Sequence, residues 1–192
     1  MRNTRFCFPR PLLGIALLSC FASRVGAQSA IPANDNSPAS VVQKYCKLDL
    51  DGARLSSQNS NNDAITALAT WPIEPGWDTS VVVSAFEIVS KNIGPRESSV
   101  TVRYIVLGKM FGAKVTPSQK QKELVTFVLR KSHGGWLIER PLIAPHVSVS
   151  AAISALHGLL DDEKDPEQIK RLNAGIDLLV RWKNGAGSSK AP

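Results

Sequence analysis

Four segments rich in Val, Ile, Phe and Tyr occupy the middle of the chain, and turn-forming residues separate them. β-Branched and aromatic residues favour strands, and short connections between strands favour antiparallel pairing. These segments therefore predict a sheet of about four antiparallel strands, against which every other element must pack. Their ranges are 80–90, 98–109, 123–132 and 136–142.

The first two segments form a predicted hairpin around Gly94-Pro95. This turn aligns the apolar positions of the two strands and places Glu87 near Arg103 on the other face. Residues 110–122 follow as a long basic loop, which would allow contact with an acidic partner or a membrane surface. Loops of this length in compact domains are typically functional or mobile.

The last two segments form a second predicted hairpin. A two-residue turn at Gly134-Gly135 places Arg130 directly opposite Glu139, and this opposite-charge pair supports the register. The apolar face of this hairpin then comprises Val125, Phe127, Leu129, Trp136 and Ile138.

Amphipathic periodicity predicts two helices before the sheet. From Pro38 onward, apolar residues recur on one face at the 3.6-residue period, and charged residues, Arg54 among them, lie opposite. Cys46 lies at the edge of the apolar face, where a small buried side chain is the simplest interpretation. Asp63 can cap a short second helix. The apolar face of the first helix carries Val41, Val42, Tyr45, Leu48, Gly52 and Leu55.

Two further helices are predicted after the sheet. Ser148 can cap a helix over residues 149–160. Asp165 and Pro166 then form the start signal of another helix, which Gly185 can end.

The elements together predict an α+β fold, with N-terminal helices packed on a curved antiparallel sheet of about four strands and two helices at the C-terminal end. A single domain spans residues 38–183, of which 151–183 form a C-terminal helical extension. A polar lead-in over 28–37 and a tail over 184–192 are expected to be disordered and flexible, respectively.

Residues 1–27 have the pattern of a signal peptide. A start rich in arginine and free of acidic residues precedes an apolar stretch over 12–21, which is too short to span a bilayer. Val25-Gly26-Ala27 then predicts cleavage before Gln28 and a periplasmic or secreted protein.

Two alternatives compete with this signal. Leu17-Leu18-Ser19-Cys20 is close to a bacterial lipobox, so that acylation of Cys20 would give a membrane-anchored lipoprotein. A mitochondrial presequence would share the arginines, but it should be amphipathic rather than continuously apolar.

The formal charge of the 192 residues is +7, which at first favours a nucleic-acid partner. Cleavage would remove four of the 23 basic residues and leave 19 against 16 acidic ones, an ordinary balance of +3. The remaining basic residues are dispersed, so nucleic-acid binding is not expected. Cys46 would be the one cysteine left, either as a free thiol or, if exposed, in an intermolecular bridge.

The order of two helices and a curved sheet is carried by residues 41–46 (VVQKYC), 77–83 (WDTSVVV), 100–104 (VTVRY), 124–128 (LVTFV) and 135–139 (GWLIE). It resembles the nuclear transport factor 2-like superfamily over about residues 38–147. The resemblance implies a helix packed in a concave sheet beside a conical apolar pocket. The chain departs from that plan in lacking a clear helix between its first two strands and in adding two C-terminal helices. The superfamily contains enzymes, binding modules and partner subunits, so it implies no single activity.

A pocket of this kind would bring certain side chains together. The candidate ligand-binding residues are Trp77, Tyr104, Phe127 and Trp136. The candidate catalytic residues are His146, Asp78 and Tyr104, because His146 follows the last strand and an acid–base group at the pocket would support a lyase, isomerase or hydrolase. Trp77 lies in a proline-stiffened connector and could gate the pocket.

The expected function is an exported, non-catalytic domain that holds a small apolar ligand or a protein partner on its curved sheet. The alternatives are a small enzyme of the type just described and an accessory subunit of an envelope assembly. A homodimer is possible. The sequence has no Cys/His metal set, phosphate-binding glycine loop or nucleophile elbow, so no cofactor or metal is expected.

Overall fold

The computed structural model describes residues 36–71, 73–119 and 121–186. The predicted signal peptide, its cleavage site and the lipobox lie outside these residues, as do most of the lead-in and the last six residues of the tail.

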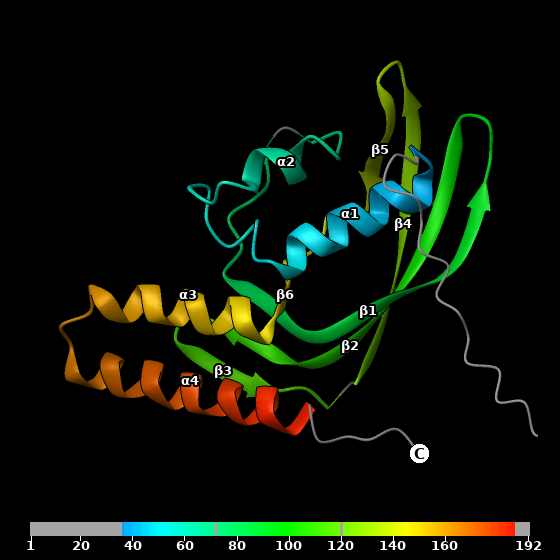
Figure 1. Ribbon diagram of the computed structural model, residues 1–192. Helices are drawn as coiled ribbons and strands as arrows, with labels where there is room; N and C mark the ends of the chain where they lie inside the picture. Colours follow the sequence, from blue (N-terminus) through cyan, green and yellow to red (C-terminus); the bar gives the residue numbers. More distant parts are fainter. Residues whose placement is uncertain (1–35, 72, 120, 187–192) are drawn as a thin grey trace, which may run out of the picture. The chain divides into compact units, whose positions relative to one another are not determined.

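The described part of the chain is an α+β unit, as the sequence predicts (Figure 1). The helices are α1 (Pro38–Leu50), α2 (Asn62–Thr66), α3 (Val149–Asp161) and α4 (Pro166–Ala186). The strands are β1 (Thr79–Ile93), β2 (Glu97–Phe111), β3 (Lys114–Pro117), β4 (Lys122–Ser132), β5 (Gly135–Arg140) and β6 (His146–Ser148). They form one sheet in the order β5-β4-β2-β1-β6, with β3 paired to the end of β2.

The sheet differs from the prediction of about four antiparallel strands, because it has six strands in the described residues and is mixed. β3 lies inside the predicted basic loop and folds back along β2. β6 pairs in parallel with β1, His146 lying opposite Val81. Strands of three or four residues are too short to produce a recognisable pattern and are fixed by the partner they pair with.

β1 and β2 form the long curved spine of the sheet. Their pairing shifts register at Val82/Val83, Val83/Ala85 and Ile88/Ser90. Each irregularity adds local twist and bends the strand, which curls the sheet. Buried and less buried residues alternate along β2, so that one side of the sheet is covered and the other is open.

The predicted register of the first hairpin is confirmed. Glu87 lies opposite Arg103, and the two side chains form an ion pair at 3.1 Å on the open side of the sheet.

The predicted register of the second hairpin is wrong by two residues. The turn is formed by His133 and Gly134, and Ser132 pairs with Gly135. Gly135 is the first residue of β5, and its φ of +131° is a backbone conformation that favours glycine. Arg130 therefore lies opposite Leu137, although its side chain still reaches Glu139 diagonally in an ion pair.

α1 begins where the sequence predicts and ends early. Ser37 caps it by accepting a hydrogen bond from Ser40 N at 3.2 Å. The helix ends at Leu50, before the predicted apolar position Leu55, because Gly52 adopts φ +84°, a typical helix-ending conformation. Arg54 consequently lies beyond the helix and is buried rather than on a solvated helix face.

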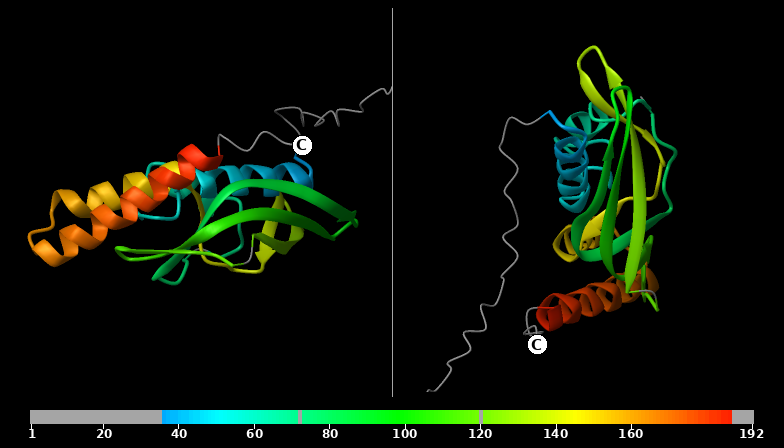
Figure 2. Two further views of the ribbon diagram at one scale, coloured as in Figure 1. Left: turned by 90° about the horizontal axis from the view of Figure 1, so that it is seen from below. Right: turned by 90° about the vertical axis from the view of Figure 1, so that its right-hand side faces the viewer.

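The helix arrangement also differs from the predicted one. The N-terminal helices were expected to cover the sheet, but the C-terminal helices α3 and α4 pack on it as well. In both views of Figure 2, α1 and α3 lie on the same side of the sheet, and α4 runs along α3 at the end of the sheet where β3 lies. α1 packs on β2, β4 and β5 through a first core that includes Tyr45, Phe127 and Leu129. α3 and α4 form a second core with Val82 and Met110 at the other end of the spine.

The caps of the C-terminal helices are confirmed. Ser148 accepts a hydrogen bond from Ala151 N at 3.1 Å, and Asp165 accepts one from Glu167 N at 3.0 Å. α4 continues through Ala186, past the residue where the flexible tail was expected to begin.

The second core depends on a close approach of α4 to β2 at Gly108. A Cβ atom at this position would overlap the ring of Trp182 and the carbonyl oxygen of Thr116. Gly108→Ala should therefore lower the free energy of unfolding by about 1–3 kcal/mol, measured by urea denaturation. Gly134→Ala is the control, because a Cβ there would meet no atom within 4 Å. Equal stability of the two variants would contradict this packing.

Candidate functional site

The concave side of the sheet is filled by protein. Tyr104 and Phe127 are fully buried in the first core, and the rings of Tyr45 and Phe127 meet edge to face at 5.6 Å. Trp136 is half-buried at the rim of this core, with the Lys131 ammonium 5.7 Å from its ring. The expected ligand-binding residues Tyr104, Phe127 and Trp136 thus pack against protein, whereas Trp77 lines the pocket described below.

A buried charged cluster joins α1 to the segments that follow it. Arg54 donates from Nε to both carboxylate oxygens of Glu74, at 2.9 and 2.8 Å, and its Nη2 lies 2.7 Å from Oε2. Its Nη1 lies 3.2 Å from Asp49 Oδ2, and Nη2 donates to the carbonyl oxygen of Ile143 at 2.6 Å. We refer to Asp49, Arg54, Glu74 and this carbonyl as the Arg54 cluster.

Asp49 is the less compensated acid of the Arg54 cluster. One guanidinium serves two carboxylates, and Glu74 takes most of its donors. Asp49 is fully buried and also accepts a hydrogen bond from His146 N at 2.9 Å, while its Oδ1 has no hydrogen-bond partner. Burial raises the pKa of Asp49 to about 7, and Arg54 offsets only part of that effect.

His146 is held behind this cluster with its side chain 2% exposed. Its Nδ1–H donates to the carbonyl oxygen of Ala144 at 2.9 Å, and its ring lies 4.3 Å from that of Tyr104. Its Nε2 lies 3.5 Å from a carboxylate oxygen of Glu123, and burial lowers the pKa of the imidazole. The structure therefore brings two catalytic candidates together, His146 and Tyr104, and buries both.

Cys46 is buried beside Tyr104. Its Sγ lies 3.1 Å from the hydroxyl oxygen of Tyr104, and burial raises the pKa of the thiol to about 12. The side chain is fully buried, as the simplest interpretation of the sequence predicts.

The connector between α2 and β1 is fixed by Glu74. The indole nitrogens of Trp71 and Trp77 donate to its two carboxylate oxygens, at 3.3 and 3.1 Å. The Arg54 guanidinium carbon lies 5.9 Å from the centre of the Trp77 ring. The Arg54 cluster therefore positions Trp77 from two directions.

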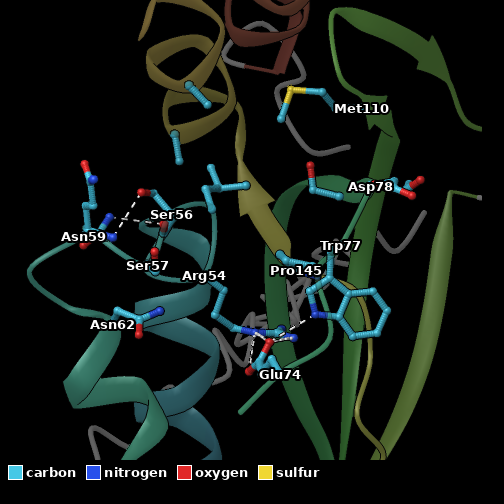
Figure 3. Close-up of a pocket in the computed structure, with 18 of the residues that line it drawn as sticks. Arg54, Ser56, Ser57, Asn59, Asn62, Glu74, Trp77, Asp78, Met110 and Pro145 are labelled. Atoms are coloured by element: carbon cyan, nitrogen blue, oxygen red, sulfur yellow. Dashed lines mark hydrogen bonds and ion pairs between the residues drawn. The ribbon is translucent and has the colours of Figure 1, made fainter. Parts of the chain in front are cut away.

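A pocket of about 1120 Å³ opens beside this connector. Its walls come from residues 51–59, from α2, from residues 73–80 and from α3. We refer to it as the Trp77 pocket. In Figure 3, the Trp77 indole stands on one side and Ser56, Ser57 and Asn59 on the other, with Arg54 and Glu74 between them.

Two amides shape the loop wall of the Trp77 pocket. Asn59 Nδ2 donates to the carbonyl oxygen of Gly52 at 3.2 Å, and Asn62 Nδ2 donates to that of Ala53 at 3.3 Å. Asp78, the third catalytic candidate, is exposed and lines this pocket, away from His146. The three candidates are thus not assembled into one site.

The cluster of Asp49, Arg54 and Glu74 was not predicted from the sequence. A signal for Asp49 was present, since it follows Val42, Tyr45 and Cys46 on the buried face of α1 at helical spacing. An acidic residue at such a position needs a buried partner. The partners themselves are distant in sequence, so no local pattern identifies them.

Comparisons with known proteins identify no relative, because no family model, curated protein or solved structure matches the chain. Within the described residues, no group of three or more His, Cys, Asp or Glu side chains is placed to hold a metal ion. No helix in that part of the chain has the length and apolar character that a membrane span needs.

Removing the guanidinium tests the Arg54 cluster. Above pH 7, where Asp49 ionises, Arg54→Met should lower the free energy of unfolding by about 3–5 kcal/mol, because it leaves the carboxylates of Asp49 and Glu74 without their shared countercharge. Arg103→Met is the matched control, since its ion pair with Glu87 is 40% and 59% exposed and should contribute about 1 kcal/mol or less. Chemical denaturation of both variants measures the difference, and equal losses would contradict the assignment.

The raised pKa of Asp49 predicts a pH dependence of stability. The folded state holds the Asp49 proton up to about pH 7, whereas the unfolded state releases it near 3.8, so the contribution of Asp49 to stability falls as pH rises between these values. His146, whose pKa is lowered, acts in the opposite direction, because its contribution is lost as pH falls below about 6.5.

Asp49→Asn isolates the first contribution. Its free energy of unfolding relative to wild type should increase with pH between about 4 and 7, by at most about 1.4 kcal/mol per pH unit, and level off above that range. Denaturation of both proteins across this pH range is the measurement. Parallel profiles would show that Asp49 is ionised throughout.

Proposed function

We propose that the protein is a non-catalytic binding domain whose small-molecule ligand occupies the Trp77 pocket. The observation that carries this proposal is a pocket of about 1120 Å³ whose walls are held by partly buried hydrogen bonds. This is the binding function expected from the sequence, but at a different site. The proposed site lies at the edge of the unit rather than on the concave sheet, and both polar and apolar groups line it.

Preorganisation supports a binding site at this position. Glu74 fixes Trp77 through the indole nitrogen and is itself fixed by Arg54. Asn59 and Asn62 fix the opposite wall to the chain at Gly52 and Ala53. Walls that are already ordered cost little conformational entropy when a ligand binds.

The position of the acid–base groups favours binding over catalysis. His146, Tyr104 and Cys46 are buried together, and none of them is among the residues that line the Trp77 pocket. Arg54 lines the pocket, but Asp49, Glu74 and the carbonyl of Ile143 occupy its donors. A general acid or base must reach its substrate within hydrogen-bond distance, and buried His146, Tyr104 and Cys46 have no open path to one. Asp78 lines the pocket, but none of these three groups stands beside it there.

We further propose that the domain is related in fold to the nuclear transport factor 2-like superfamily and acts outside the cytoplasm. A helix packed on the concave side of a curled sheet supports the first point. The pattern of residues 1–27 supports the second.

Blocking the pocket tests the proposed function. Ser154 and His157 are both exposed on α3, but only Ser154 lines the Trp77 pocket. Ser154→Trp should abolish binding of pocket ligands in a ligand-observed NMR screen of a mixed small-molecule library against the full chain. His157→Trp should retain wild-type binding. If no compound distinguishes the two variants, the pocket is not a binding site.

A further inference from the structure

We infer that the ligand of the Trp77 pocket is an uncharged, polyhydroxylated molecule, a sugar or short oligosaccharide. The inference rests on the proposed function and names the chemistry of its ligand. Three properties of the lining residues support it: an aromatic face, a wall of hydroxyl and amide groups, and the absence of an available cation among the residues that line the pocket.

Trp77 supplies the aromatic face. Its indole N–H is already donated to Glu74 at 3.1 Å and the Arg54 guanidinium lies over one part of the ring, so the ring offers a ligand its remaining π-surface rather than a hydrogen bond. The face of an aromatic ring carries negative charge and attracts weakly positive C–H groups. The C–H groups on one side of a sugar ring match this surface.

The loop wall supplies the polar groups. In Figure 3, Ser56, Ser57 and Asn59 stand across the pocket from Trp77. Hydroxyls and amides both donate and accept hydrogen bonds, as the hydroxyls of a sugar do. The uncharged polar side chains of this wall are Ser56, Ser57, Gln58, Asn59, Asn62 and Thr66.

The charges disfavour an anionic ligand. Arg54 is the one basic residue among the described residues that line the pocket, and two carboxylates already neutralise it. Asp51 and Asp78 also line the pocket and would repel a phosphate or carboxylate. Their oxygens can instead accept hydrogen bonds from neutral hydroxyl groups, which charged acceptors strengthen.

A cationic ligand also fits poorly. Glu74 is paired with Arg54, and Asp51 and Asp78 are exposed to solvent, where their attraction for a cation is screened. A purely apolar ligand would leave the Ser57 hydroxyl and the Asp51 and Asp78 carboxylates without hydrogen bonds once water is displaced. A neutral polyol satisfies both the aromatic and the polar surfaces.

The experiment compares four classes of probe on the full-length chain by saturation-transfer NMR. The neutral probes are cellotriose, maltotriose and N,N′,N″-triacetylchitotriose. The anionic, cationic and apolar probes are tri-galacturonic acid, spermidine and n-octanol. At least one neutral trisaccharide should bind, and Ser154→Trp should abolish that binding while His157→Trp preserves it.

Trp77 provides the second comparison. Trp77→Ala should weaken trisaccharide binding at least tenfold, and Trp77→Phe should restore part of it, because a smaller aromatic face remains. Trp136→Ala is the control, since Trp136 packs at the rim of the first core and does not line the pocket. Circular dichroism and the melting temperature show whether each variant remains folded.

The outcomes separate this inference from the proposed function. Binding of spermidine, n-octanol or tri-galacturonic acid alone, lost in Ser154→Trp, would overturn the sugar assignment and leave the binding function in place. Trisaccharide binding that survives both Ser154→Trp and Trp77→Ala would overturn the assignment to this pocket. No probe binding sensitive to Ser154→Trp would overturn both.

Discussion

The remaining structure depends on the hydrogen bonds and ion pairs of the Arg54 guanidinium. It connects three segments that are far apart in sequence: the end of α1 through Asp49, the connector through Glu74, and the segment before β6 through the carbonyl of Ile143. Asp49 extends the connection to the main chain of His146, where β6 begins its parallel pairing with β1. A single side chain therefore sets the positions of the helix, the pocket wall and the edge of the sheet.

Burying this cluster has an electrostatic cost, the desolvation of its carboxylates, and Asp49 bears most of it. Two buried or half-buried carboxylates face one guanidinium, and the geometry favours Glu74, which accepts from two of its nitrogens. Asp49 is left with one contact to the guanidinium, at 3.2 Å, and its complete burial raises its pKa to about 7. A buried carboxylate that retains a proton avoids part of the desolvation penalty. The cluster can thus be buried without full charge balance.

Local rules predict the elements of this fold better than they predict its site. The Glu87–Arg103 register and the caps at Ser148 and Asp165 follow from short-range patterns, and the structure confirms them. The strands β3 and β6 are too short for such patterns, and a glycine φ shifts the second hairpin by two residues. The Arg54 cluster joins positions up to 94 residues apart, so its composition depends on tertiary packing. Only the acidic residue on the apolar face of α1 indicates from the sequence that such a cluster exists.

The first core and the pocket of the proposed binding site are lined by largely different residues. Protein atoms cover Tyr104 and Phe127 entirely, so both side chains pack in the first core. Glu74 belongs to both the Arg54 cluster and the pocket, because it neutralises Arg54 and also fixes the Trp77 indole. A change at Glu74 would loosen the core and the pocket together. Ser154 can therefore report on the proposed binding by itself, because it lines the pocket and is exposed on α3, whereas Trp77 is bonded to Glu74 of the cluster.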